Sequence, residues 1–337
     1  MKSIISFLKV ALPLAFGVFL IWYVFKDLTV QEKEELYTAF GQANYFWIFV
    51  SIGLGILSHV SRAIRWKYTI QPLGKTPGFW NSFFTVMIGY VANLALPRLG
   101  EVTRPGLLAK YEGLSFNKLF GTIVAERVAD LIILALIMAS IVLMELEMLK
   151  DMLLEFIDAG SGKFSLQNLI VLIVVALVGA GIFFFLMLGK STNPFFIKIR
   201  ELFKGVLEGA QSILKMEKKG YFLMHTAFIW IMYIGMFYAC FYSLEETSEV
   251  PFAGVLASFV TGSLAIVFVQ GGLGVFPIAI METLLLYGVT KTSALALGWI
   301  LWSSQTLMVI VLGVLSIPLL RFVNRNKKIE IVTDNQA

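Results

Sequence analysis

The sequence has few charged residues, one cysteine and two histidines, and each shortage excludes a class of protein. Only 15% of its 337 residues are Asp, Glu, Lys or Arg, whereas soluble proteins have about 25%. So few charged side chains cannot cover a water-facing surface, which excludes a soluble globular domain. The single cysteine, Cys240, excludes a disulfide framework and a thiolate metal cluster. His59 and His225 form no metal-binding motif, so neither a metal nor a cofactor is expected.

The composition predicts an all-α polytopic membrane protein. Apolar residues make up 58% of the chain, and the mean hydropathy is +0.83. A helix needs about twenty apolar residues to cross the ~30 Å hydrocarbon core of a bilayer. The first such run resembles a signal peptide but has no small-residue cleavage site, so it is expected to stay as a span. The six predicted spans are 4–25, 45–64, 119–144, 168–188, 222–243 and 293–319.

Loop charges predict the topology. The loops 62–80 and 189–221 and the tail 321–337 are rich in Lys and Arg, which is typical of the cytoplasmic side. The loops 145–167 and 244–250 are acidic on balance and are expected outside. The net charge of +5 is therefore interpreted as a topology signal and not as a nucleic-acid interface. The prediction is a bacterial inner-membrane protein with both termini in the cytoplasm.

Two further apolar segments, 83–113 and 253–288, are predicted to be re-entrant or broken helical hairpins. The first is interrupted at Pro97 and the second at QGGLG, and the loop charges agree only if neither segment crosses the membrane. Similar motifs recur in 97–115 and 270–290, separated by close to half the chain. Three spans separate the hairpins, so the repeats would be inverted, as in many secondary transporters. The predicted hairpin tips contain Pro97, Gly100, Gly271, Gly272 and Gly274.

These features divide a single integral membrane domain, residues 1–320, into halves of about 1–144 and 168–320. The segment 195–215 is predicted to be an amphipathic cytoplasmic helix, either along the membrane surface or packed on the ends of the spans. Its Gly205 and Gly209 lie outside the membrane, so their spacing carries no weight as a dimerisation motif. A homodimer is left open.

Charged side chains in the first half form the candidate site, because several lie at membrane depth. If the span begins near Leu119, Glu126 lies about 10 Å and Asp130 about 16 Å along it. An ionisable group at such depth is costly unless it is paired or faces water, which suggests a functional site. The candidate lipid- or phosphate-binding residues are Asn93, Arg98, Glu101, Arg104, Glu126, Arg127 and Asp130, with Arg62 and Arg65 as a patch that first receives anionic headgroups.

Arginine suits a phosphate ligand because its planar guanidinium makes two charge-assisted hydrogen bonds at once. The expected partner is therefore a membrane phospholipid or a polyprenyl-phosphate lipid. Two alternatives stay open. The charges could form a structural ion network that ties the hairpin to the following span, and Arg62 and Arg65 could reach the membrane surface for topology alone.

Four sequence motifs stand out: R-x-x-R-W at 62–66, N-x-x-x-P-R-L-G-E-x-x-R at 93–104, E-R-x-x-D at 126–130 and G-G-L-G-V-F at 271–276. Together they resemble the family built around the transmembrane (flippase) region of bacterial lysylphosphatidylglycerol synthases, and the resemblance covers essentially the whole chain. In the lysyl-lipid members, this region is thought to move aminoacylated phosphatidylglycerol between leaflets while a separate cytoplasmic domain makes the lipid. No synthase domain follows in these 337 residues, so the resemblance implies a stand-alone member.

The sequence thus predicts a flippase-like protein that binds a phosphate-containing amphipathic lipid and moves it between leaflets. The competing interpretation is a membrane enzyme or accessory factor that acts on polyprenyl-phosphate-linked glycans, since the same family includes archaeal proteins linked to dolichol-phosphate glycosylation. The sequence contains no nucleophile–base pair, metal set or phosphate-binding loop, which favours transport over catalysis.

Overall fold

The computed structural model describes residues 15, 17–26, 28–96, 98–145, 211 and 213–326, and this part of the chain contains helices and turns but no strand. Residues Met1–Met138 and Met216–Ala337 form one compact unit, to which every contact and cavity described below belongs. The other unit, Ala139–Lys215, is largely outside the described residues. So are Pro97, the predicted span 168–188, nearly all of the predicted helix 195–215 and most of the basic tail.

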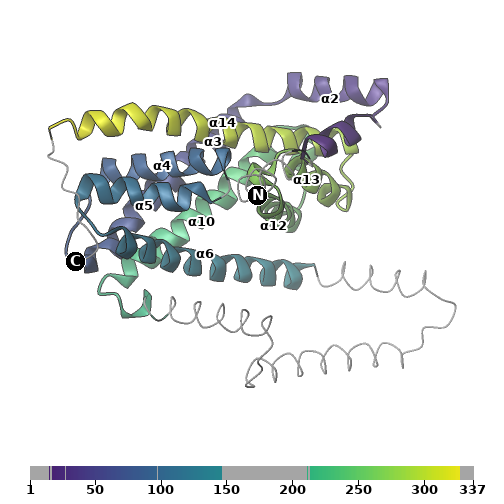
Figure 1. The fold of residues 1–337 in the computed structure, drawn as a ribbon. Helices are drawn as coiled ribbons and strands as arrows, with labels where there is room; N and C mark the ends of the chain where they lie inside the picture. The colour runs from purple at the N-terminus through teal and green to yellow at the C-terminus, as the bar shows by residue number, and fades with distance from the viewer. Residues whose placement is uncertain are drawn as a thin grey trace, which may run out of the picture. The chain divides into compact units, whose positions relative to one another are not determined.

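The described residues form long helices joined by short turns (Figure 1). Three of them are long and apolar enough to cross a membrane: the stretch Tyr45–Leu73, α10 and α14. The six predicted spans remain a prediction beyond these three. The helices are α2 (Val30–Gln42), α3 (Tyr45–Ile70), α4 (Phe79–Ala95), α5 (Leu99–Glu112), α6 (Phe116–Met144), α10 (Lys219–Phe241), α11 (Glu245–Ser248), α12 (Phe252–Phe268), α13 (Val275–Leu285) and α14 (Lys291–Val323), with 3₁₀ turns η1 (Gln71–Leu73) and η2 (Gln270–Gly272).

Two pairs of consecutive helices pack against each other as hairpins, α4 with α5 and α12 with α13. In the first pair, Gly89 and Gly100 allow a close approach, because a Cβ on Gly100 would collide with the Gly89 carbonyl. In each tip the chain is first extended and then turns into the left-handed region, at Arg98 (φ 63°, ψ 3°) and at Gly271 (φ 67°, ψ 3°). The two predicted interruptions are therefore sharp turns between helices.

The order α3, α4, α5, α6 recurs as α10, α12, α13, α14 about half the chain later. Helices α4 and α12 both have 17 residues. At the tips, Arg98 aligns with Gly271. The turn of the second hairpin is longer than that of the first, so the alignment shifts after the tip. There, Phe116 at the start of α6 aligns with Lys291 at the start of α14.

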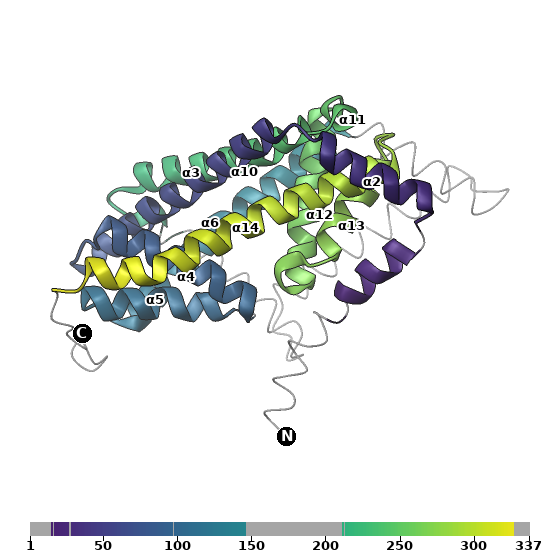
Figure 2. The same ribbon diagram turned by 90° about the horizontal axis from the view of Figure 1, so that it is seen from above.

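Helices α3 and α10, the first members of the two repeats, lie side by side (Figure 2). At one end of the pair, Asn44 N–H donates to the Ser243 carbonyl (2.7 Å). Toward the other end, Ser61 Oγ lies 2.8 Å from His225 Nδ1. Because a later position in α3 contacts an earlier position in α10, the two helices are antiparallel.

The structure corrects two expectations about boundaries. The predicted loop 62–80 is much shorter, because α3 continues to Ile70 and carries Arg62 and Arg65 inside the helix bundle. Acidic partners on α6 offset the cost of burying these charges. Helix α2 was not predicted, although its start has a capping box in which Thr29 and Glu32 accept each other's backbone N–H groups (3.1 and 2.7 Å).

Candidate functional site

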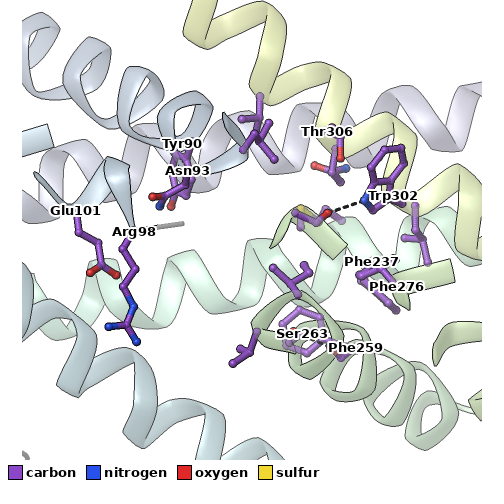
Figure 3. Close-up of a pocket in the computed structure, with 18 of the residues that line it drawn as sticks. Tyr90, Asn93, Arg98, Glu101, Phe237, Phe259, Ser263, Phe276, Trp302 and Thr306 are labelled. Carbon is purple, nitrogen blue, oxygen red and sulfur yellow. Dashed lines mark hydrogen bonds between the residues drawn. The ribbon is translucent and has the colours of Figure 1, made fainter. Parts of the chain in front are cut away.

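A cavity of about 510 Å³ lies between the two hairpin tips and the helices α6, α10 and α14 (Figure 3). It is the size of a typical small-molecule site. Both halves of the chain contribute to its wall. The first half supplies Tyr90, Asn93, Leu94, Arg98, Glu101 and Arg127, and the second supplies Met236, Phe237, Phe259, Ser263, Ile266, Val267, Gly271, Phe276, Leu301, Trp302, Gln305, Thr306 and Val309.

Every first-half residue in this wall has an equivalent in the second half that also lines the cavity. Residues are called equivalent where the helices of the two repeats align, with the alignment shifted after the hairpin tip as described above. The first-half wall is therefore repeated in the second half, which adds further lining residues of its own from α10, α12 and α14. The pairs are Tyr90 with Ser263, Asn93 with Ile266, Leu94 with Val267, Arg98 with Gly271, Glu101 with Phe276 and Arg127 with Trp302.

The two contributions differ in polarity. Figure 3 shows Arg98 and Glu101 at one end of the cavity and Phe237, Phe276 and Trp302 at the other. Arg98 and Arg127 are exposed, and within the described part of the chain neither forms a salt bridge. The cavity can therefore receive an anion at one end and an apolar chain at the other.

Hydrogen bonds fix both tips. Asn93 Oδ1 accepts the Gly100 backbone N–H (2.7 Å), which holds the last turn of α4 to the start of α5. Trp302 Nε1 donates to the Gly271 carbonyl (2.7 Å), drawn as the dashed line in Figure 3. The tips also approach each other, since a Cβ on Gly271 would lie 3.4 Å from Leu94 Cδ2.

A second group of charges lies beside the cavity in a buried ion network. Asp130 pairs with Arg62 (3.0 Å) and with Arg65 (2.8 Å), and Glu126 pairs with Arg104 (2.9 Å) and approaches Arg65 Nε (3.6 Å). The Arg104 guanidinium also lies over the Trp66 ring at 3.8 Å. These contacts join α3, α5 and α6, and the side chains of Arg65 and Glu126 are 0% and 1% exposed. The network holds the first hairpin to its neighbouring helices.

The structure thus separates the predicted site residues into two groups. Asn93, Arg98, Glu101 and Arg127 line the cavity. Arg62, Arg65, Arg104, Glu126 and Asp130 belong to the network, although Arg62 and Arg104 also line a water-sized pocket of about 20 Å³ that shares Glu101 and Arg127 with the cavity. The expected surface patch of Arg62 and Arg65 is wrong, because both side chains are buried and paired with acids.

Sequence reasoning named Gly271 at the second tip, which lines the cavity, but it missed the other residues of the second-half wall. Phe237, Phe259 and Trp302 line the cavity, but in the sequence they are indistinguishable from other aromatic residues of apolar spans. The sequence alone could have identified Trp302 as a lining residue, because alignment of the two repeats pairs it with Arg127, a predicted site residue. Among the described residues, no group of His, Cys, Asp and Glu side chains has a metal-binding arrangement.

Comparisons with known proteins identify the family of the chain. The chain is 34% identical over 90 residues to the UPF0104 membrane protein MJ1595 of Methanocaldococcus jannaschii, an alignment that covers 26% of this chain and 27% of that protein. No solved structure matches. The family described as the lysylphosphatidylglycerol synthase TM region matches residues 10–313. With a match over nearly its whole length, the chain belongs to the lysylphosphatidylglycerol synthase TM region family.

Proposed function

We propose that this protein binds a phosphate-containing amphipathic lipid in the cavity between its hairpins and moves it between the leaflets of a membrane. The observation that carries the proposal is the division of one cavity into a charged and an apolar wall. The Arg98 and Arg127 guanidinium groups would bind the phosphate, and Glu101 would orient them or meet a cationic part of the headgroup. The aromatic wall would hold part of an acyl or polyprenyl chain.

The proposal includes an inverted repeat with two re-entrant hairpins that enter from opposite faces. The repeated order of helices and the antiparallel packing of α3 and α10 support it. A binding site between broken helices of inverted repeats is the usual arrangement in secondary transporters. The loop charges support an inner-membrane location with both termini in the cytoplasm.

Leaflet exchange of a fluorescent phospholipid in proteoliposomes tests the proposal. The decisive variant is Arg98→Lys, which keeps the charge but removes the bidentate guanidinium. We expect exchange per folded molecule to fall at least about tenfold, the equivalent of one charge-assisted hydrogen bond. The matched control is Arg321→Lys, an exposed arginine in the last turn of α14, which should leave exchange unchanged.

Two results would contradict the proposal. Normal exchange in a monodisperse Arg98→Lys protein would remove the cavity as the lipid site. A new covalent product, detected by mass spectrometry of the vesicle lipids after incubation with polyprenyl-phosphate-linked glycan, would favour the competing assignment as an enzyme.

A further inference from the structure

The tip of the second hairpin is held to α14 by one side chain. The Trp302 indole N–H donates to the Gly271 carbonyl at 2.7 Å, and Gly271 has the left-handed torsions that close the tip. On another side, Gly17 of the N-terminal helical segment packs directly against the Leu273 carbonyl and Gly274. The second tip is therefore fixed from two directions.

The corresponding position in the first half has a different side chain and no such bond. Arg127 on α6 takes the place of Trp302, and Arg98 takes the place of Gly271, with closely similar torsions. The Arg98 carbonyl accepts the Glu101 backbone N–H (3.2 Å) and keeps a second lone pair. The flanking residues Leu96 and Leu99 are 45% and 38% exposed. In the described residues, the first tip is thus held by Asn93 on α4, which accepts the Gly100 N–H, but not by a side chain of α6.

We propose that Arg127 is a positioning residue that anchors the first tip in a second conformation, by donating to the Arg98 carbonyl when the bond from Trp302 to Gly271 breaks. This inference rests on the proposed transport function. When one repeat moves against the other, the two halves can exchange conformations, so that each tip is bonded to the long helix that follows it, α6 or α14, in only one of two states. The structure would then show the state in which the second tip is anchored.

The chemistry of the two anchors suits such an exchange. The bond from Trp302 is a single neutral hydrogen bond of small net free energy, so it can break and re-form within a transport cycle. A bond from the Arg127 guanidinium would be charge-assisted and stronger, which can offset the loss of the Trp302 bond. The Arg127 guanidinium faces the cavity, where it can bind either the lipid phosphate or the Arg98 carbonyl. Loss of the phosphate would free Arg127 for the tip, which links release of the lipid to closure of the first hairpin.

The test measures both tips at once by electron-electron double resonance in phosphatidylglycerol-containing nanodiscs. One spin-label pair, Val267 with Leu307, reports on the second tip, and the other, Leu96 with Ile132, reports on the first. All four positions are at least 40% exposed, and the labels are introduced in a Cys240→Ser background. The key variant is Trp302→Phe, which keeps an aromatic ring and removes the N–H.

The matched control is Trp299→Phe, because Trp299 Nε1 on the same helix is buried and has no hydrogen-bond partner among the described residues. In Trp302→Phe, we expect longer Val267–Leu307 distances and shorter Leu96–Ile132 distances, with a population change of roughly 2- to 12-fold. Trp299→Phe should resemble the wild type. Adding Arg127→Met to Trp302→Phe should abolish the shorter Leu96–Ile132 population and leave the longer Val267–Leu307 population.

Three results would overturn the inference: equal distributions in Trp302→Phe and Trp299→Phe, a change at the second tip without one at the first, or a shorter Leu96–Ile132 population that survives Arg127→Met. The transport proposal is separable from it. Paired distance changes without leaflet exchange would leave the two anchors standing and remove transport. Leaflet exchange without paired changes would remove the anchors alone.

Discussion

The two halves of this protein share a backbone plan and differ in the chemistry of their side chains. Both have a long helix, a helical hairpin with a left-handed residue at its tip, and a second long helix. In the first half, the wall of the cavity carries Arg98, Glu101 and Arg127, and at the equivalent positions the second half has Gly271, Phe276 and Trp302. One repeated backbone thus produces a cavity that is charged on one side and uncharged and mostly apolar on the other.

The two halves also differ in the contacts that hold each hairpin to the helices around it. The first hairpin is tied to α6 by the buried pair of Arg104 with Glu126, and Asp130 on α6 extends the network to Arg62 and Arg65 on α3. The equivalents of Glu126 and Asp130 on α14 are Leu301 and Gln305. The second hairpin is held by apolar packing and by the hydrogen bond from Trp302. A buried ion network is therefore not required to hold a hairpin of this kind, which points to specificity as the reason for the charges.

The largest expected effect comes from breaking the network on one side. Arg104→Ala should lower the free energy of unfolding by about 3–5 kcal/mol, because it leaves the buried Glu126 with only the longer contact to Arg65. The measurement is thermal unfolding in detergent by tryptophan fluorescence. The double variant Arg104→Met with Glu126→Leu imitates the apolar second half and should recover most of the loss. A double variant as unstable as Arg104→Ala would show that the first hairpin cannot be held in the manner of the second.

A smaller effect is expected at the tip. Arg98 is the only described non-glycine residue with positive φ, and such a conformation costs about 1–2 kcal/mol in a residue with a side chain. Arg98→Gly gives the first tip the residue of the second and should raise the free energy of unfolding by about 1 kcal/mol, while leaflet exchange falls at least about tenfold. Arg98→Ala is the control, because it loses the guanidinium but keeps the strain. An Arg98→Gly protein with no gain in stability would remove the argument from strain.

The smallest expected effect concerns the hydrogen bonds at the N-termini of α6 and α14. At α6, Ser115 Oγ accepts the Lys118 backbone N–H (3.4 Å). At α14, Glu246 on α11 accepts the backbone N–H and the hydroxyl of Thr290 (2.6 and 2.8 Å). Burial raises the pKa of Glu246, but hydrogen bonds from Ser293 and Thr290 outweigh it and hold the pKa below its ordinary value. The stabilising form of this contact is therefore the carboxylate.

The contribution of Glu246 to stability depends on pH. Because the folded-state pKa is lowered, the contribution of Glu246 is fully present above the ordinary pKa of a glutamate and is lost as the pH falls through the folded-state pKa. Glu246→Gln should lower Tm at neutral pH by about 2 °C. Wild type and variant should converge in thermal scans as the pH falls from about 5 to about 3. A difference that persists at the lower pH would show that the charge of Glu246 is not responsible.

Much of the fold was accessible from the sequence because the bilayer restricts what a chain can do. Long apolar runs predicted α10 and α14 to within a few residues, and Pro97 and QGGLG marked the two interruptions. The end of α3 was missed because charged side chains usually mark a loop, whereas Arg62 and Arg65 have acidic partners far away in the chain. Helix α2 was missed because its capping box, Thr29 with Glu32, precedes a polar stretch with no apolar run.

By itself, the sequence determined a helical membrane protein with two interrupted hairpins and charged residues that need partners or a cavity. Composition and the cost of burying charge decide these properties residue by residue. Only the tertiary structure decided which charges are paired and which face the cavity. Glu101 and Glu126 are both acids near arginines in the sequence, but one lines the cavity and the other is buried against Arg104. That distinction depends on how far apart side chains from different helices lie, and packing sets this distance.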